Sequence, residues 1–243
     1  MLRILYQDAW IVAIDKPSGL LVHRSPIDKR EHRFALQEVR NLIGQHVYPV
    51  HRLDKPTSGT LLFALDPTVA ATLSHMFRSG DVEKSYVAVV RGYTDAQGVI
   101  DHPLKQMLDT KAQKAQGITK EAQEALTYYH TLARVELPFC VDRYPTTRYS
   151  MVALQPKSGR KHQLRRHMKH IHHHMIGDTK HGRGEHNRFF REHFGLTRLL
   201  LHAYKLSFNH PVSGKKLDIQ APLCDEFLQI VEKLGWNGIE LGT

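Results

Sequence analysis

The chain has 243 residues, of which 41% are hydrophobic, and a formal net charge of +10. This composition is ordinary for a globular protein with a buried core, and the length suits one large domain or two small lobes. No run of about 18 apolar residues occurs, so we expect no membrane-spanning helix. The first residues include Asp8 and Asp15 and no apolar stretch of signal-peptide length, so we expect no signal peptide and predict a cytoplasmic protein. The positive charge indicates a polyanionic partner.

Strand and helix patterns alternate along the chain. Short segments rich in β-branched and aromatic residues predict strands, whereas apolar residues spaced by three or four predict helices. The expected strands cover residues 2–6, 10–14, 60–65, 83–91, 127–137, 147–155, 199–208 and 217–220. The expected helices cover residues 33–43, 67–79, a segment that begins at Gly159, and residues 222–234. This mixture of hairpin turns and helical connections predicts an α+β fold around one extended mixed sheet with flanking helices and loops.

Two stretches lack these patterns. From about residue 105 to 125 the composition shifts to Lys, Gln, Ala, Glu and Thr, which predicts an exposed or mobile insertion with little core. Residues 177–195 are polar and glycine-rich, and their pattern assigns them neither a helix nor a strand. The chain otherwise contains no internal repeat and no convincing linker, so residues 1–243 are predicted to form a single domain.

Positive charge is densest between Arg160 and Arg191. Nine Lys or Arg residues stand there against two acidic ones, with eight histidines interspersed. The helix expected at the start of this block places Leu164 and Met168 on one face and several cations on the others. Such a block can line a groove for phosphates, with an affinity that falls steeply with salt. A solvated basic face with no partner is the alternative.

The histidines also suggest a metal enzyme, which we consider less favoured. His167 and His170 are three apart on the expected helix and could share a metal ion, but no His-Glu-x-x-His sequence occurs. Histidine in a basic block can equally contact phosphates and bases. Cys140 and Cys224 stand far apart and outside any Cys-x-x-Cys spacing, so we expect two buried free thiols and no disulfide.

One stretch is more specific than any of these features. Residues 51–59 read His-Arg-Leu-Asp-Lys-Pro-Thr-Ser-Gly and run directly into an apolar strand. They place the carboxylate of Asp54 between two cations, Arg52 and Lys55, on a turn that the following strand makes rigid. An ordinary solvated turn would also favour Asp and Pro. The complete string, however, resembles the active-site signature of the pseudouridine synthases.

Other segments resemble motifs of the same family, in the same order. They are Lys-Pro-Ser-Gly at 16–19, Lys-Ser-Tyr-Val-Ala at 84–88, Gly-Arg-Lys-His-Gln-Leu-Arg at 159–165, Gly-Asp at 177–178 and Leu-His-Ala at 201–203. Lys161 and the string at 173–175 depart from the residues commonly found at these positions, but neither departure affects an implied catalytic group. The matches extend over most of the chain. They imply a pseudouridine-synthase fold, with a mainly antiparallel sheet and no separate RNA-binding module.

The resemblance also implies roles for individual residues. Asp54 would be the catalytic carboxylate, acting either as a nucleophile at the sugar or as a base at C2′. Arg165 would hold it by an opposite charge, Tyr86 would stack on the uracil, and Leu164 would pack on the other side of the ring. Arg52 would reach into the RNA where the target nucleotide has left the stack.

The implied enzyme is an isomerase that converts a uridine in RNA to pseudouridine without cofactor or metal ion. RNA would be its partner, with no obligate protein partner, and the chain would act as a monomer. The strings at 4–8, 143–149 and 192–196 are similar to a bacterial branch of the family that modifies uridine 65 of transfer RNA. A synthase for ribosomal RNA and a non-catalytic RNA-binding protein of the same fold are the alternatives.

Overall fold

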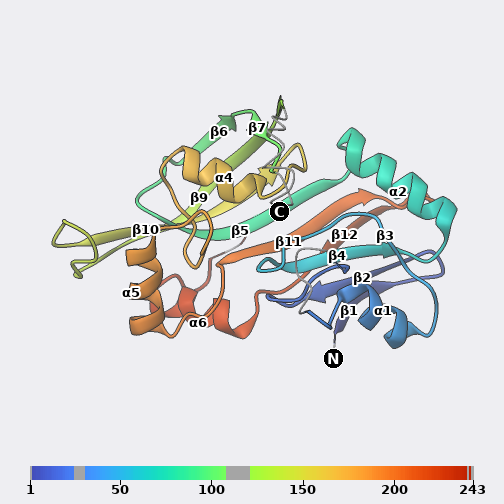
Figure 1. Ribbon diagram of the computed structural model, residues 1–243, viewed down its shortest axis with the longest axis horizontal. Coiled ribbons are helices and arrows are strands. Elements are labelled where there is room, and N and C mark those ends of the chain that lie inside the picture. Colours follow the sequence, from blue (N-terminus) through green and yellow to red (C-terminus); the bar gives the residue numbers. More distant parts are fainter. Residues whose placement is uncertain (1, 25–30, 108–120, 240, 242–243) are drawn as a thin grey trace, which may run out of the picture.

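The computed structural model describes residues 2–24, 31–107, 121–239 and 241 (Figure 1). The strands are β1 (Arg3–Gln7), β2 (Ile11–Lys16), β3 (Tyr48–Pro49), β4 (Ser58–Ala64), β5 (Glu83–Arg91), β6 (Gln97–Asp101), β7 (Leu104–Lys105), β8 (Ala122–Gln123), β9 (Leu126–Leu137), β10 (Thr147–Pro156), β11 (Leu201–Asn209) and β12 (Lys216–Gln220). The helices are α1 (Ala35–Ile43), α2 (Pro67–Ser79), α4 (Gln163–His170), α5 (Gly184–Phe194) and α6 (Asp225–Lys233). Within these residues no helix is long and apolar enough to cross a membrane.

One ten-stranded sheet extends along the long axis of the molecule (Figure 1). Its main path runs β1-β2-β4-β11-β5-β10-β9-β6, while β12 pairs with β11 and β3 pairs with β4. Among the described strands, β4 and β11 form the one parallel pair. The predicted α+β fold with an extended, mainly antiparallel sheet is confirmed.

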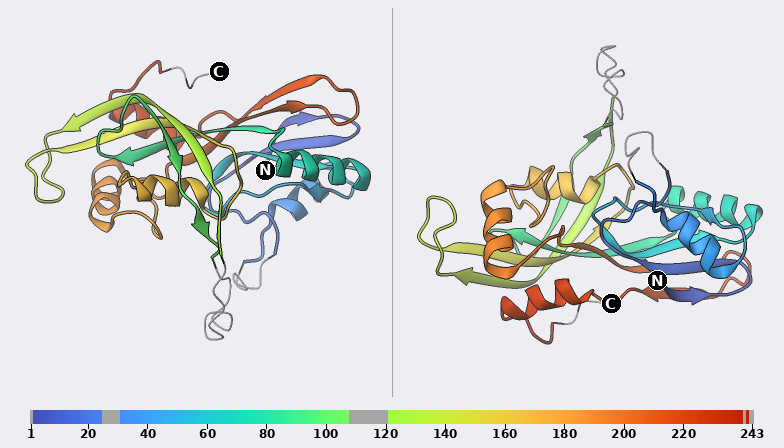
Figure 2. Two further views of the ribbon diagram at one scale, coloured as in Figure 1. Left: turned by 90° about the horizontal axis from the view of Figure 1, so that it is seen from above. Right: turned by 60° about the horizontal axis from the view of Figure 1, so that its bottom comes forward.

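Helices cover both faces of this sheet. Alternate residues of a strand point to opposite faces, so Leu61 of β4 packs in the cluster of α1, whereas Leu62 packs in the cluster of α2. In the same way, Ala88 of β5 packs with α4, and Val89 packs with α5 and α6. The two views in Figure 2 place α4 and α6 on opposite sides of the sheet. All seven residues of β4 are buried, and burial on both faces explains why its second half, Leu-Leu-Phe-Ala, is continuously apolar.

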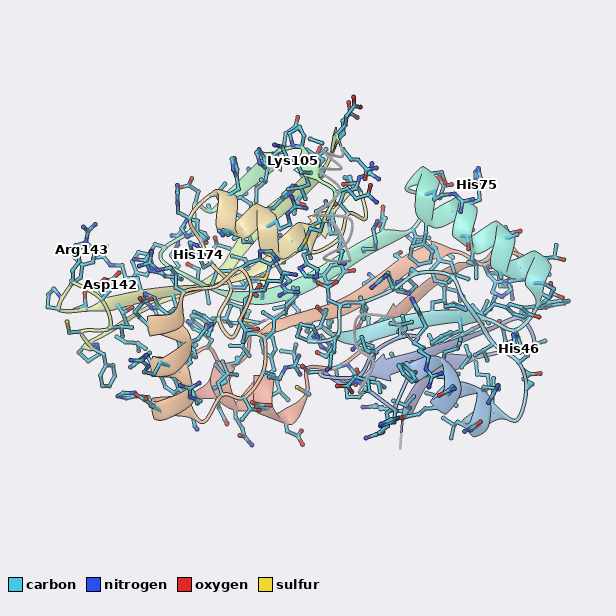
Figure 3. The ribbon with its side chains drawn as sticks, in the orientation of Figure 1. His46, His75, Lys105, Asp142, Arg143 and His174 are labelled. Carbon is cyan, nitrogen blue, oxygen red and sulfur yellow. The ribbon has the colours of Figure 1, made fainter. Side chains whose placement is uncertain are left out.

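The structure adds one helix that was not predicted and corrects one expectation. Residues 177–195 contain the helix α5, whose buried face includes Phe189 and Phe190. Cys140 is exposed rather than buried, whereas Cys224 is partly buried; both are free thiols. Cys140 lies in the connection between β9 and β10, whose far end carries Asp142 and Arg143 (Figure 3).

Most of the insertion expected at 105–125, residues 108–120, lies outside the described residues. The strands β7 and β8, which flank it, pair with each other.

The parallel pair joins two of the motifs found in the sequence. Ser58 stands opposite His202, and Gly59 stands opposite Ala203. Ser58 Oγ also contacts His202 Nδ1 at 2.7 Å in the buried core. Gly59 has φ 111°, and a Cβ atom there would lie 2.2 Å from the carbonyl oxygen of Ala203. The Thr-Ser-Gly and Leu-His-Ala motifs therefore contact each other, because the β4 and β11 backbones approach closely at these residues.

Replacing Gly59 with alanine should separate β4 from β11. The added Cβ would collide with backbone, and the φ angle disfavours any side chain, so we expect a loss of more than about 1 kcal/mol in the free energy of unfolding. Urea denaturation measures this loss. Gly80→Ala is the matched control, because Gly80 has φ 90° but no atom within 4 Å of an added Cβ. Equal losses in the two variants would mean that the contact with Ala203 contributes nothing.

Candidate active site

A cleft of about 1080 Å³ opens beside the loop that precedes β4. Side chains of this loop, α2, β5 and α4 line it, together with the segment that precedes β9 and the segment that follows β10. All five site residues predicted from the sequence line the cleft: Arg52, Asp54, Tyr86, Leu164 and Arg165. The fold thus brings together residues from three separate parts of the chain.

Asp54 is held by Arg165, which is itself held by a second carboxylate, Asp178. Nη1 of Arg165 donates to Oδ2 of Asp54 at 3.0 Å, and the Asp54 side chain is 20% exposed toward the cleft. On its other side Arg165 is bidentate with Asp178, through Nε at 2.7 Å and Nη2 at 2.8 Å. Backbone N–H groups of Lys180 and His181 also donate to Asp178. Asp178 belongs to the Gly-Asp motif, but its residue type and position along the chain do not indicate this role.

The electrostatics of this pair follow from its burial. Burial by itself would raise the pKa of Asp178, but the hydrogen bonds and charge of Arg165 outweigh it and hold that pKa below its usual range. Burial would likewise lower the pKa of Arg165, and the two carboxylates raise it instead. The guanidinium therefore stays charged and presents a fixed positive group to Asp54.

The loop of Asp54 is fastened to the turn that follows β2. Nζ of Lys16 is completely buried and donates to the carbonyl oxygens of Pro17 at 2.9 Å, Leu20 at 2.7 Å and Lys55 at 3.3 Å. The N–H of Gly19 also donates to the Lys55 carbonyl, at 2.8 Å. Burial lowers the pKa of Lys16 to about 7. The Lys-Pro-Ser-Gly motif, at the end of β2, therefore holds the Asp54 loop in place through hydrogen bonds to the Lys55 carbonyl.

Lys16→Met should weaken this attachment. Methionine has a similar length but no donor, so the loop carbonyls would lose their partner; we expect a destabilisation of about 1–3 kcal/mol together with slower catalysis. Urea denaturation and a turnover assay of the same preparations would measure both effects. Lys215→Met, in the exposed turn before β12, is the control. Unchanged stability in Lys16→Met would show that the Lys16 amine does not hold the loop.

Tyr86 and Leu164 form apolar walls of the cleft. Tyr86 lies on β5 and packs against the clusters of both α1 and α4, whereas Leu164 lies on α4 and is 6% exposed. Burial, followed by the nearby charge of Asp54, raises the pKa of Tyr86, so its hydroxyl stays protonated. These side chains offer a flat ring and an aliphatic surface to a planar ligand, as expected for a base-binding site.

The rim of the cleft is strongly basic. Five cations line it, against Asp101 and Glu124 as additional carboxylates; the cations are Arg52, Arg78, Lys84, Lys157 and Arg160. Arg52 and Arg160 are exposed. An excess of cations around a cleft attracts phosphate groups and makes binding salt-dependent.

The histidines of the basic block make contacts other than metal ligation. His167 is buried, with Nδ1 2.9 Å from Thr127 Oγ1 and Nε2 3.0 Å from the carbonyl oxygen of His102. The His102 ring stacks on that of His170, with 3.7 Å between the centroids. In the described part of the chain, no three His, Cys, Asp or Glu side chains converge as ligands for a metal ion. Two other histidines belong to the site: His162 lies beside Asp54, with Nε2 3.8 Å from Oδ2, and His181 contacts the His162 ring.

Comparison with known proteins identifies the family. A sequence model described as RNA pseudouridylate synthase matches residues 10–170. The chain belongs to this family. The resemblance predicted from the motifs is thereby confirmed, as is the enzyme class, an isomerase of uridine in RNA.

Several relatives of this family member cover almost its whole length. It is 51% identical to tRNA pseudouridine synthase C of Vibrio cholerae over 237 residues, 98% of this chain and 97% of the relative. It is 48% identical to the protein of the same name from Haemophilus influenzae, with 98% and 100% covered. The solved structure of human RNA pseudouridylate synthase domain containing 4 superposes with a TM-score of 0.70 at 26% identity, covering 96% of this chain and 93% of that one.

Proposed function

We propose that the protein converts uridine 65 of transfer RNA to pseudouridine, in the cytoplasm and as a monomer without an obligate protein partner. The observation that carries this proposal is the Asp54 carboxylate, held by Arg165 at a basic cleft in a member of the RNA pseudouridylate synthase family. The choice of transfer RNA is supported by relatives about half identical over nearly the full length, which carry the name tRNA pseudouridine synthase C.

The reaction requires the target nucleotide to leave the RNA helix. A stacked base cannot rotate, so the uridine must be flipped into a pocket. In our proposal Arg52, exposed on the rim, enters the RNA beside the vacated position, while the other rim cations contact phosphates. Tyr86 and Leu164 would then enclose the uracil ring between them.

Within the cleft Asp54 would break the C1′–N1 bond, either by attacking C1′ or by taking the proton from C2′. The detached uracil turns between Tyr86 and Leu164 and rejoins C1′ through C5. In the nucleophilic route this new bond displaces the Asp54 carboxylate from C1′, and in the base route Asp54 returns the proton to C2′. C5 then loses its proton and N1 gains one, so the product has the same composition as the substrate. This chemistry requires no cofactor and no metal ion.

Mapping pseudouridine in defined RNA tests the proposal. Purified protein is incubated, with chelator present, with unmodified transfer-RNA and ribosomal-RNA transcripts, and pseudouridine is located by carbodiimide treatment and primer extension. We expect one reverse-transcription stop, at position 65 in the T stem. A transfer RNA carrying cytidine at that position is the control. A stop in ribosomal RNA alone would replace the target, and no stop in any transcript would reject the enzyme activity.

A further inference from the structure

His162 lies at the Asp54 carboxylate, and the proposed function assigns it no role. It occupies the N-cap position of α4 with φ 56° and ψ 28°, in the left-handed region. A non-glycine residue in this region is strained, and such residues cluster at functional sites, whereas glycine would adopt it freely. The side chain makes no capping hydrogen bond with the helix. The contacts of the imidazole ring are therefore the reason to look for a function.

The ring bridges Asp54 and His181. Its Nε2 is 3.8 Å from Oδ2 of Asp54, the same oxygen that Arg165 Nη1 approaches to 3.0 Å. Its Nδ1 is 2.8 Å from His181 Nε2, and the two rings are nearly perpendicular, at 82°. The His162 side chain is 12% exposed, so it belongs to the wall of the cleft.

The protonation state of this pair sets the direction of its hydrogen bond. Burial lowers the pKa of both His162 and His181 to about 4, so both rings are neutral at neutral pH. One ring then donates across the 2.8 Å contact and the other accepts. A lone pair on His162 Nε2 would face the carboxylate and be repelled by it, whereas an N–H would be attracted. His181 Nε2 therefore donates to Nδ1, and His162 carries its proton on Nε2.

We propose that His162 is a positioning residue for Asp54. Its Nε2–H and the Arg165 guanidinium hold the same oxygen, Oδ2, so that Oδ1 is the atom presented to the nucleotide. The 3.8 Å separation is longer than a hydrogen bond, and hydrogen bonds at active sites often shorten only when substrate binds. The role is the same whether Asp54 attacks the sugar or takes a proton. This inference rests on the proposed function.

Three variants test the role. His162→Phe keeps a planar ring and removes both nitrogens, while His162→Gln keeps an N–H donor of similar reach. His172→Phe is the matched control, because His172 is also a non-glycine residue with positive φ, 64°, but its side chain is exposed. For each variant we would measure the single-turnover rate at saturating enzyme and the dissociation constant for one transfer-RNA transcript.

We expect His162→Phe to slow the single-turnover rate by about 10- to 100-fold, without a change in RNA affinity. His162→Gln should recover most of this rate, and His172→Phe should keep both quantities. A wild-type rate in His162→Phe would overturn the proposal, as would a loss confined to affinity or one that glutamine does not restore. Should His162→Phe fail to fold, His181→Phe decides instead: removing the donor to Nδ1 must slow the rate, and an unchanged rate overturns the role.

These results distinguish the positioning role from the proposed function. If the wild-type protein forms no pseudouridine in transfer or ribosomal RNA, the proposed function is rejected. If the wild-type protein is active and its His162 variants behave like the His172 control, only the positioning role is rejected.

Discussion

Asp54→Asn should abolish pseudouridine formation while the protein still folds and binds RNA. An amide can neither attack C1′ nor take a proton from C2′, so we expect the turnover rate to fall by at least about 10⁴-fold, as for the loss of other essential catalytic groups. The fold should remain, because Asn has nearly the same shape and Arg165 keeps its bidentate pair with Asp178. Pseudouridine mapping, filter binding to transfer RNA and thermal unfolding measure the three quantities.

Asp101→Asn is the matched control, because Asp101 lines the same cleft but has no proposed part in the reaction. It should retain activity. Retained turnover in Asp54→Asn would remove the catalytic assignment. Loss of RNA affinity in step with activity would instead mean that Asp54 serves mainly to shape the binding surface.

Asp178→Asn should produce the largest loss of stability. Arg165 and Asp178 have side chains only 5% and 1% exposed, and removing one partner leaves the other charge buried with poor compensation. We expect a loss of about 3 kcal/mol in the free energy of unfolding, the lower end of the range for broken buried pairs, because Asp54 still partners Arg165. Activity should fall as well, since Arg165 would no longer be held toward Asp54. Urea denaturation and turnover measure the two effects.

The stability difference should depend on pH with a defined sign. The pKa of Asp178 is held below its ordinary value of 3.8 by Arg165, so the carboxylate stabilises the folded protein at and above that pH. The difference between wild type and Asp178→Asn should persist at neutral pH and shrink as the pH falls below about 4. Glu136→Gln, which removes an exposed partner of Arg148, should change little at any pH. Equal effects of the two substitutions would contradict the importance of burial.

The predictable elements were those whose signals are local. Asp66 accepts hydrogen bonds from the N–H groups of Thr68 and Val69, and Gly80 ends α2 in a left-handed conformation, as their residue types indicate. Helix α5 lacks the start signal: it begins after Arg183, which makes no side-chain cap, and has glycine as its first residue, although Gly195 ends it in a left-handed conformation. Its stability comes from tertiary packing of Phe189 and Phe190 against Tyr149 and α6, which no local pattern reveals.

The same distinction applies to the site. The motif around Asp54 and its family resemblance named the carboxylate and the residues that were expected to surround it. They did not indicate that Asp178 completes the hold on Arg165, or that His162 reaches Asp54 from a left-handed position. The first contact depends on how the segment between α4 and α5 folds back on α4, and the second on how the start of α4 lies beside the Asp54 loop. Distances of this kind follow from tertiary structure and not from the spacing of residues along the chain.

The contact between β4 and β11 has a consequence for biosynthesis. Ser58 and His202, which meet there, are separated by 144 positions. When the Asp54 loop leaves the ribosome, the strand that will fix β4 from one side has not been translated. The β4 segment therefore remains in the nascent chain without its β11 partner. Such an unpaired strand edge can pair wrongly, and we expect chaperones to bind the chain at this stage. We expect the active site to become complete only after residue 203 has emerged, so that it is assembled late and the unfinished chain is inactive.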